Sequence, residues 1–321
     1  MAPLVSVVMP VYQGERWLSE ALESAFAQTF ENFELIAVDD GSTDRSVEIL
    51  EDWSRRETRL RLVQVTHGGV TRARERALQE ARGRFAAFLD QDDRWLRTRL
   101  ERELPYADDE TVVFSDIYLA TLDEEPWGKV SDLVPRPNVE WPAQGLFPLM
   151  LERDFVHILT VLAPIRQLVA NGSFRRAERL GFGDAGGCGD YEMWLALALK
   201  GVKFHYVDEP LAIYRYHPEQ ASADVFQNAG EHLLVFDSFQ REVRGSDLRV
   251  LRRARQAERK RLEVAHRKEA WRSLLEHERR TARGHLLASL RARPTALRAW
   301  VALALVHVPP LARRVAARGT A

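Results

Sequence analysis

Short apolar runs alternate with amphipathic segments through the first 115 residues, and this alternation constrains the fold more than any other feature. The apolar runs have the length of buried strands and cover residues 5–9, 33–38, 60–65, 85–89 and 112–115. Between them, apolar residues recur every three or four positions, which is helical spacing. This alternation predicts an α/β fold with a mostly parallel central sheet sandwiched by helices.

Polar residues directly follow three of these predicted strands. The clusters are Pro10–Tyr12, Asp39–Asp40 and Asp90–Asp93. In open α/β sheets, ligands bind outside the carboxyl ends of the strands. We therefore expect the three clusters to lie along one edge of the sheet and to form a binding site there.

The pattern changes beyond this first segment. Prolines crowd residues 126–148, which predicts loop or hairpin structure. A helix is expected over 190–200, followed by strands over 202–207 and 211–214. From residue 225 onward the chain is predicted to be helical and is rich in arginine.

Charge is divided between the body of the chain and its tail. Residues 1–240 hold 25 basic and 40 acidic side chains, whereas residues 241–321 hold 21 basic and 7 acidic ones. An acidic body argues against a nucleic-acid-binding protein, which would be basic overall. The basic tail is compatible with docking on an anionic membrane surface, with packing on the acidic body, or with a homodimer contact.

Cysteine content and the termini bear on the compartment. Cys188 is the single cysteine, so no intrachain disulfide can form, and it is interpreted as structural. The N-terminus has no basic segment before its apolar run, which argues against a cleaved signal peptide. The longest uncharged apolar run, 299–312, is shorter than the roughly 20 residues that span a bilayer. A cytoplasmic protein is expected, with peripheral contact at the inner face of the membrane as an open alternative.

Asp90, Asp92 and Asp93 form the densest acidic cluster at a predicted strand end. Carboxylates so close repel one another unless a cation lies among them, and Mg²⁺ or Mn²⁺ prefers oxygen ligands. The alternative is a solvated turn that caps the helix starting near Trp95. For the isolated motif the turn is favoured, but the position at the carboxyl edge of the predicted sheet makes the two interpretations about equally supported.

Other acidic residues are similarly ambiguous. Asp39 and Asp40 could contact a ribose or a base, or could form a turn and helix cap. Asp190 and Glu192 open a helix, where the helix dipole stabilises acidic groups, but either could also be a general base. A G-x-G-x-x-G fingerprint is absent after the first predicted strand, which argues against a Rossmann dehydrogenase.

Taken together, the segments resemble family 2 glycosyltransferases of the GT-A fold, which have a Rossmann-like nucleotide-binding half. Matching segments occur in the family's order over about 215 residues: Val5–Tyr12, Val38–Asp44, Gly69–Arg74, Phe88–Asp93, Gly189–Trp194 and Tyr214–His217. The resemblance implies a GT-A domain over 1–224, with a nucleotide-sugar half at 1–115 and an acceptor half at 116–224. Residues 225–321 would be a basic α-helical extension.

The resemblance also implies roles for single residues. Nucleotide-sugar contacts would come from Pro10, Tyr12, Asp39, Asp40, Arg74, Asp90 and Asp92. Metal ligands would be Asp92, Asp93 and His217, and Asp190 would be the catalytic base with Glu192 as its rival. The chain departs from the family at His67 and Glu75, where asparagine is common, and at Gly189, where glutamate is common.

The implied function is an inverting, metal-dependent hexosyl- or N-acetylhexosaminyl-transferase. It would use Mn²⁺ or Mg²⁺ and move a sugar from a nucleotide diphosphate, UDP above all, to a glycan or lipid-linked glycan of a bacterial surface polysaccharide. Two alternatives remain open. One is a non-catalytic nucleotide-sugar-binding protein on the same fold, and the other is a sugar-1-phosphate nucleotidyltransferase.

Overall fold

The computed structural model describes residues 2–121, 126–129, 140–141, 145–182, 187–220, 223–276 and 278–306. The chain divides into two compact units, Met1–Ala223 and Asp224–Ala321. The predicted hairpin region between residues 126 and 148 lies largely outside the described residues.

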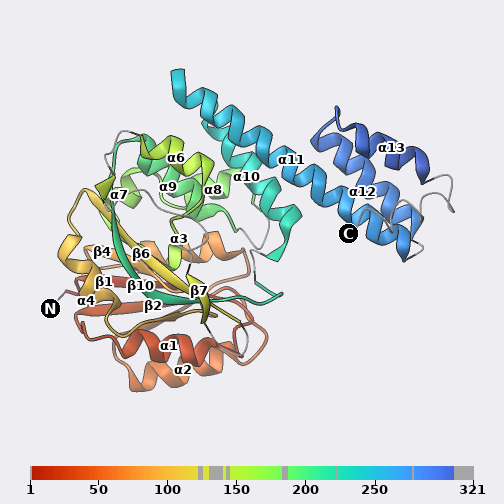
Figure 1. Cartoon of the computed structure of the whole chain (residues 1–321). Coiled ribbons are helices and arrows are strands. Elements are labelled where there is room, and N and C mark those ends of the chain that lie inside the picture. Colours follow the sequence, from red (N-terminus) through yellow and green to blue (C-terminus); the bar gives the residue numbers. More distant parts are fainter. Residues whose placement is uncertain are drawn as a thin grey trace. The chain divides into compact units, whose positions relative to one another are not determined.

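The first part of the sheet follows the strand–helix alternation of the sequence. Its neighbouring strands are all parallel and lie in the order β3, β2, β1, β4. Figure 1 shows α1 and α2 on one face of the sheet and α3 on the other. The strands are β1 (Val5–Val11), β2 (Phe33–Asp39), β3 (Leu60–Gln64) and β4 (Phe85–Phe88), and the helices are α1 (Leu18–Phe26), α2 (Ser46–Arg56) and α3 (Val70–Glu80).

The rest of the sheet is mixed. Antiparallel β9 lies between β4 and β6, β10 is parallel to β6, and β5, β7 and β8 pair antiparallel at the margins. The described residues thus form one ten-stranded sheet. Its other strands are β5 (Arg94–Trp95), β6 (Thr111–Ala120), β7 (Pro126–Lys129), β8 (Glu140–Trp141), β9 (Leu162–Pro164) and β10 (Lys203–Arg215). Its other helices are α4 (Arg99–Glu103), η1 (Leu104–Tyr106), α6 (Leu146–Glu152), η2 (Ile158–Thr160), α7 (Ile165–Ala170), α8 (Arg175–Leu180) and α9 (Gly189–Leu199).

The α/β class with helices on both faces is confirmed, and one local expectation needs correction. The predicted strands 202–207 and 211–214 are one strand, β10, which shifts its register against β6 on either side of Pro210. Proline has no N–H to donate to a ladder, so the strand accommodates it with an irregularity. The boundary between residues 115 and 116 falls inside β6, so both expected halves share one sheet.

The core explains why the first strands read as continuous apolar runs. Every residue of β1, β2 and β4 is buried, because helices cover both faces. The region also tolerates little extra volume: a Cβ on Gly83 would lie 2.7 Å from the backbone nitrogen of Ser6. This dense frame holds the loops at the strand ends.

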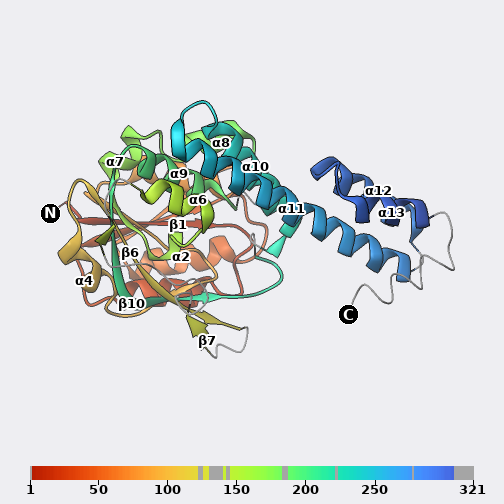
Figure 2. The same ribbon diagram turned by 45° about the horizontal axis from the view of Figure 1, so that its top comes forward.

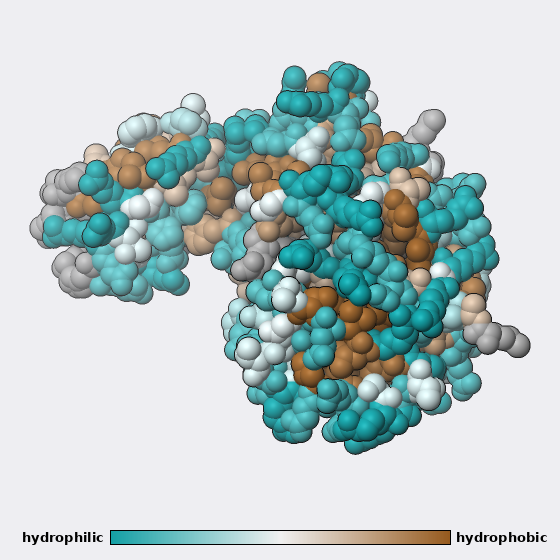
Figure 3. All heavy atoms as spheres, turned by 180° about the vertical axis from the view of Figure 1, so that it is seen from behind, coloured by the Kyte–Doolittle hydropathy of each residue, from teal (hydrophilic) through white to brown (hydrophobic). Residues whose placement is uncertain are grey.

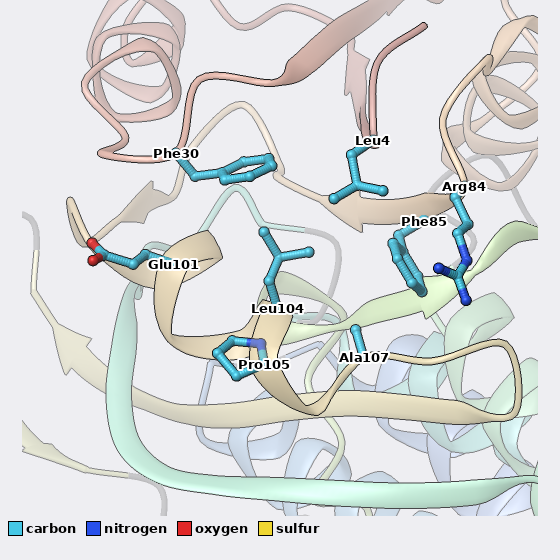
Figure 4. A pocket seen from close by; sticks show the side chains of 8 residues that line it. All are labelled: Leu4, Phe30, Arg84, Phe85, Glu101, Leu104, Pro105 and Ala107. Atoms are coloured by element: carbon cyan, nitrogen blue, oxygen red, sulfur yellow. The ribbon is translucent and has the colours of Figure 1, made fainter.

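One pocket lies at the amino ends of the strands. It has a volume of about 430 Å³, and Figure 4 shows its mainly apolar lining. Leu4 precedes β1 and Phe85 begins β4, whereas the polar clusters follow the strands. The pocket is therefore separate from the expected site.

The second unit is helical. It contains α10 (Val225–Phe239), α11 (Gly245–Leu275), α12 (Arg279–Ala292) and α13 (Leu297–Leu305). Figure 2 shows α12 and α13 beside the C-terminal part of α11. Trp271 and Leu274 of α11 pack there with Leu286 of α12 and Val306 after α13. Among the described helices, none is long and apolar enough to cross a membrane.

Candidate active site

The loops after β1 and β4 are joined by two hydrogen bonds. The Tyr12 backbone nitrogen donates to Gln91 Oε1, and Gln91 Nε2 donates to the Tyr12 carbonyl oxygen, both at 2.8 Å. Gly14 makes room for this side chain, because a Cβ there would lie 2.4 Å from Gln91 Oε1. Two of the three polar clusters are therefore directly connected. Gln91 carried no predicted role, since a single glutamine between aspartates gives no distinctive signal.

The loop after β2 is held to the same region by Gln13. Its Oε1 accepts from the backbone nitrogens of Thr43 and Asp44, at 2.9 and 3.2 Å, and Ser42 Oγ accepts from the Gln13 nitrogen at 3.0 Å. The three expected clusters thus lie along one edge of the sheet.

Asp39 and Asp40 have different surroundings, although both are buried. Asp40 accepts from the backbone nitrogens of Gly68 and Gly69 at 2.9 and 2.7 Å, and His67 Nδ1 lies 2.9 Å from its Oδ2. Among the described residues, the Asp39 carboxylate makes only long contacts of 3.3 Å, to backbone nitrogens in the following turn. The Asp40 carboxylate therefore holds the loop before α3, whereas the Asp39 carboxylate makes weaker contacts.

Tyr12 and His67 form an aromatic surface beside these carboxylates. Their rings stack with centroids 4.2 Å apart and planes inclined by 21°. Tyr12 is 43% exposed, so the stack on His67 does not enclose it. Pro10 is buried within β1 behind this loop. His67, which departs from the family pattern, thus supports the aromatic surface.

Arg74 points to Asp90. Its Nη2 lies 2.7 and 2.8 Å from the two carboxylate oxygens of Asp90, and the arginine is buried. Burial opposes the positive charge, but the carboxylates of Asp90, Asp190 and Asp92 together raise the pKa of Arg74. The pair therefore neutralises part of the acidic cluster from within the protein.

Asp92 contacts His217, which lies 125 positions later in the chain. Its Oδ2 lies 2.9 Å from His217 Nε2. The imidazole packs on Trp17 with a ring separation of 4.3 Å, and its buried Nδ1 has no hydrogen-bond partner among the described residues. A carboxylate oxygen and an imidazole nitrogen, both common metal ligands, are thus brought together.

Asp93 lies deeper than Asp92 and is held by Arg215. The Arg215 backbone nitrogen donates to Asp93 Oδ1 at 2.9 Å, and its guanidinium bonds the Asp92 carbonyl and Glu20. Burial, together with the charges of Asp92 and Asp90, raises the pKa of Asp93 well above its ordinary value. Arg215 carried no predicted role, although it lies between Tyr214 and His217 in a segment that matches the family.

The residues fit a divalent cation in part. No group of three or more His, Cys, Asp or Glu side chains within the described residues has the arrangement of a complete metal site. Mg²⁺ and Mn²⁺ are, however, often held by one or two protein ligands together with phosphate oxygens and water. Asp92 and His217 are the residues that could supply such ligands, and Asp93 lies behind them.

Asp190 stands at the start of α9 and is half-buried. Desolvation raises the pKa of its carboxyl group, and the positive charge of Arg74 partly counteracts this rise. Its rival Glu192 is 1% exposed and accepts from Arg176 Nε at 2.6 Å. Of the two, Asp190 is the more exposed.

The remaining departures from the family pattern have local structural reasons. Glu75 accepts from Arg175 Nε at 2.7 Å, so its charge is compensated. Gly189 packs closely on α3, since a Cβ there would lie 2.9 Å from Thr71 Oγ1. Cys188 is buried just before α9, in agreement with a structural role.

Comparison with known proteins identifies this arrangement as a glycosyltransferase of the GT-A type. A mannosyltransferase from Pyrobaculum calidifontis, PcManGT, solved with GDP-Man and Mn²⁺, superposes with a TM-score of 0.59 at 18% identity, covering 96% of this chain and 80% of that one. The family model for glycosyl transferase family 2 matches residues 6–161. The chain belongs to this family.

Two relatives extend the match beyond the family model. The uncharacterized glycosyltransferase EpsJ of Bacillus subtilis is 30% identical over 238 residues, covering 73% of this chain and 67% of that protein. WfaP of Escherichia coli is 29% identical over 225 residues, covering 70% and 82%. It is named a UDP-Glc:alpha-D-GlcNAc-diphosphoundecaprenol beta-1,3-glucosyltransferase.

Proposed function

We propose that this enzyme is a metal-dependent, inverting glycosyltransferase that uses a UDP-sugar and glycosylates a hydroxyl of a lipid-linked glycan. One observation supports this proposal above all: the partly exposed carboxylate of Asp190 lies close to the Arg74–Asp90 pair. The same edge of the sheet holds Asp92 and His217. Similarity to WfaP supports a UDP-sugar and a lipid diphosphate acceptor. Such an acceptor suits a surface polysaccharide made at the cytoplasmic face of the membrane.

The donor would lie across the loops after β1, β2 and β4. The nucleotide base stacks on the exposed face of Tyr12, and Asp39 accepts a hydrogen bond from the base. Asp40 would support the donor site indirectly by holding the loop before α3. Asp90 would do so by holding Arg74. Asp92 and His217 would hold the cation, which when bound stabilises the charge of the leaving diphosphate.

Asp190 would act on the acceptor. A sugar hydroxyl is a poor nucleophile near neutral pH, so a carboxylate must accept its proton as the new glycosidic bond forms. The acceptor oxygen attacks the anomeric carbon from the face opposite the diphosphate, and the bond to the diphosphate breaks. Direct displacement of this kind inverts the anomeric configuration.

A donor screen tests this function. We expect release of UDP from at least one UDP-sugar in the presence of Mn²⁺ or Mg²⁺, with loss of release in EDTA and recovery on adding back the metal. Asp92→Asn should lose the response to metal and at least about a hundred-fold in kcat/KM, because several kcal/mol of charge stabilisation disappear. Release from no donor, or equal release in EDTA, would contradict the proposal.

The acid limb of the pH profile provides a separate prediction. A raised pKa means that Asp190 keeps its proton to a higher pH, so the active base is lost as pH falls through that value. We expect the limb of kcat/KM above the ordinary aspartate value of about 3.9, measured at saturating metal. An acid limb at or below that value would argue against Asp190 as the base.

A further inference from the structure

The last part of the helical unit carries positive charge without negative charge in its own sequence. Residues 279–321 contain nine arginines and no aspartate or glutamate. Six of these arginines lie in the described α12–α13 region: Arg279, Arg280, Arg283, Arg291, Arg293 and Arg298. None of the six forms an ion pair within residues 223–276 and 278–306, whereas α11 pairs Arg261, Arg267 and Arg272 with neighbouring glutamates.

α13 also exposes apolar side chains. Leu297, Trp300 and Val301 are 74%, 53% and 50% exposed, and their spacing places them on one side of the helix. The opposite side is used by the core, since Ala299 and Ala302 are fully buried. A helix that is apolar on both sides is normally enclosed, so the outer side of α13 is suited to a partner.

The tryptophan is held in place on this outer side. Trp300 Nε1 donates to the Pro294 carbonyl oxygen at 2.9 Å, which leaves the ring exposed. On α12, Leu287 is also exposed, at 39%. Figure 3 shows hydrophobic residues at the surface of the helical unit among hydrophilic ones.

We propose that the α12–α13 surface docks on an anionic phospholipid bilayer. The arginines match lipid phosphates, and Leu297, Trp300 and Val301 match the boundary between headgroups and acyl chains, where tryptophan is favoured. α13 has nine residues, so it lies in the interface and does not span the bilayer.

Two other partners fit less well. Contact with a second copy of this surface would bring like charges together, which is unfavourable without counter-charges. A nucleic acid would neutralise the arginines but leave the apolar side of α13 in water. The proposal rests on the helical unit alone and does not depend on the donor or the chemistry at Asp190.

Vesicle sedimentation of the full chain tests the proposal. We expect binding to vesicles of phosphatidylcholine with phosphatidylglycerol, little binding to phosphatidylcholine alone, and weakening at high salt. Arg279→Gln/Arg280→Gln/Arg283→Gln should weaken binding about a hundred-fold. Each arginine near an anionic surface raises the affinity by about five-fold, and three are removed. Leu297→Ser/Trp300→Ser should weaken it about ten-fold or more.

Control variants carry changes of the same chemical kind at fewer positions elsewhere. Arg252→Gln/Arg253→Gln alters exposed arginines of α11, and Val169→Ser alters a 60% exposed valine of the first unit. Both control variants should bind vesicles within about two-fold of the wild type. The salt concentration is adjusted to compensate for the two charges that Arg252→Gln/Arg253→Gln removes. All variants should keep wild-type release of UDP in solution, so a failed donor screen and failed vesicle binding remain distinct results.

Three results would overturn the proposal. One is equal binding to neutral and anionic vesicles, and another is equal weakening by the α12–α13 variants and the controls. The third is a concentration-dependent dimer or a nucleic-acid complex that Leu297→Ser/Trp300→Ser abolishes while vesicle binding persists.

Discussion

Asp190→Asn is expected to reduce glycosyl transfer by about 100- to 10,000-fold, which is the usual contribution of a positioned general base. The amide keeps the size of the carboxyl group but cannot accept the acceptor proton. Donor binding should remain within about two-fold of the wild type. Asp190 interacts with Arg74 through charge, and the proposal gives it no contact with the donor. Single-turnover transfer and calorimetric titration with UDP measure the two quantities separately.

Glu192→Gln is the matched control for this prediction. It makes the same change two residues along α9, but at a buried group paired with Arg176. We expect a loss of stability of about 3 kcal/mol, as for a broken buried ion pair, with turnover per folded molecule close to the wild type. The reverse pattern, with transfer lost in Glu192→Gln and kept in Asp190→Asn, would assign the base to Glu192.

Arg74→Met is expected to lower the free energy of unfolding by about 3 kcal/mol. The change leaves Asp90 without its guanidinium partner and removes the positive charge that faces Asp190, and unpaired buried charges are costly. Because Asp90 is 25% exposed, we expect the lower end of the range for buried pairs. Urea denaturation followed by circular dichroism measures the loss.

The same variant tests how Arg74 acts. Adding Asp90→Asn should restore at least about 1 kcal/mol, since contacting partners are coupled. Loss of Arg74 should also raise the pKa of Asp190, because its positive charge lowers that pKa, and so move the acid limb of kcat/KM to higher pH. Arg76→Met, on the exposed side of α3 and paired with Glu80, should cost less than about 1 kcal/mol.

A different outcome would support a direct role. If Arg74→Met were as stable as the wild type and lost only UDP affinity, Arg74 would contact the nucleotide, as the family resemblance implies. The distances in the structure favour the stabilising role, with Asp90 as the partner.

Much of the fold could be predicted from contiguous stretches of sequence. The runs that predicted strands at 5–9, 33–38 and 85–89 correspond to β1, β2 and β4 within two residues at each end. The helix expected over 190–200 is α9, shifted by one residue. These predictions succeed because the apolar period is a local property, and burial between helices selects it.

Local residue preferences can be overridden where distant segments compete for the same groups. Ser42 and Thr43 are suitable residues for capping α2, but α2 begins at Ser46, and Asp44 accepts its backbone nitrogen. Ser42 and Thr43 instead bond Gln13, which lies far back in the chain. The cap preference was overridden by contacts between loops.

The sequence by itself determined the α/β alternation, the polar edge of the sheet and the motifs that indicate the family, because each is written in neighbouring residues. Only the tertiary structure decided which acidic side chains remain available. Asp40 is occupied by Gly68 and Gly69, Asp90 by Arg74, and Glu192 by Arg176. Whether a carboxylate remains available to a ligand depends on the hydrogen-bond donors that packing brings to it. Those donors come from distant segments of the chain, so no local sequence pattern predicts them.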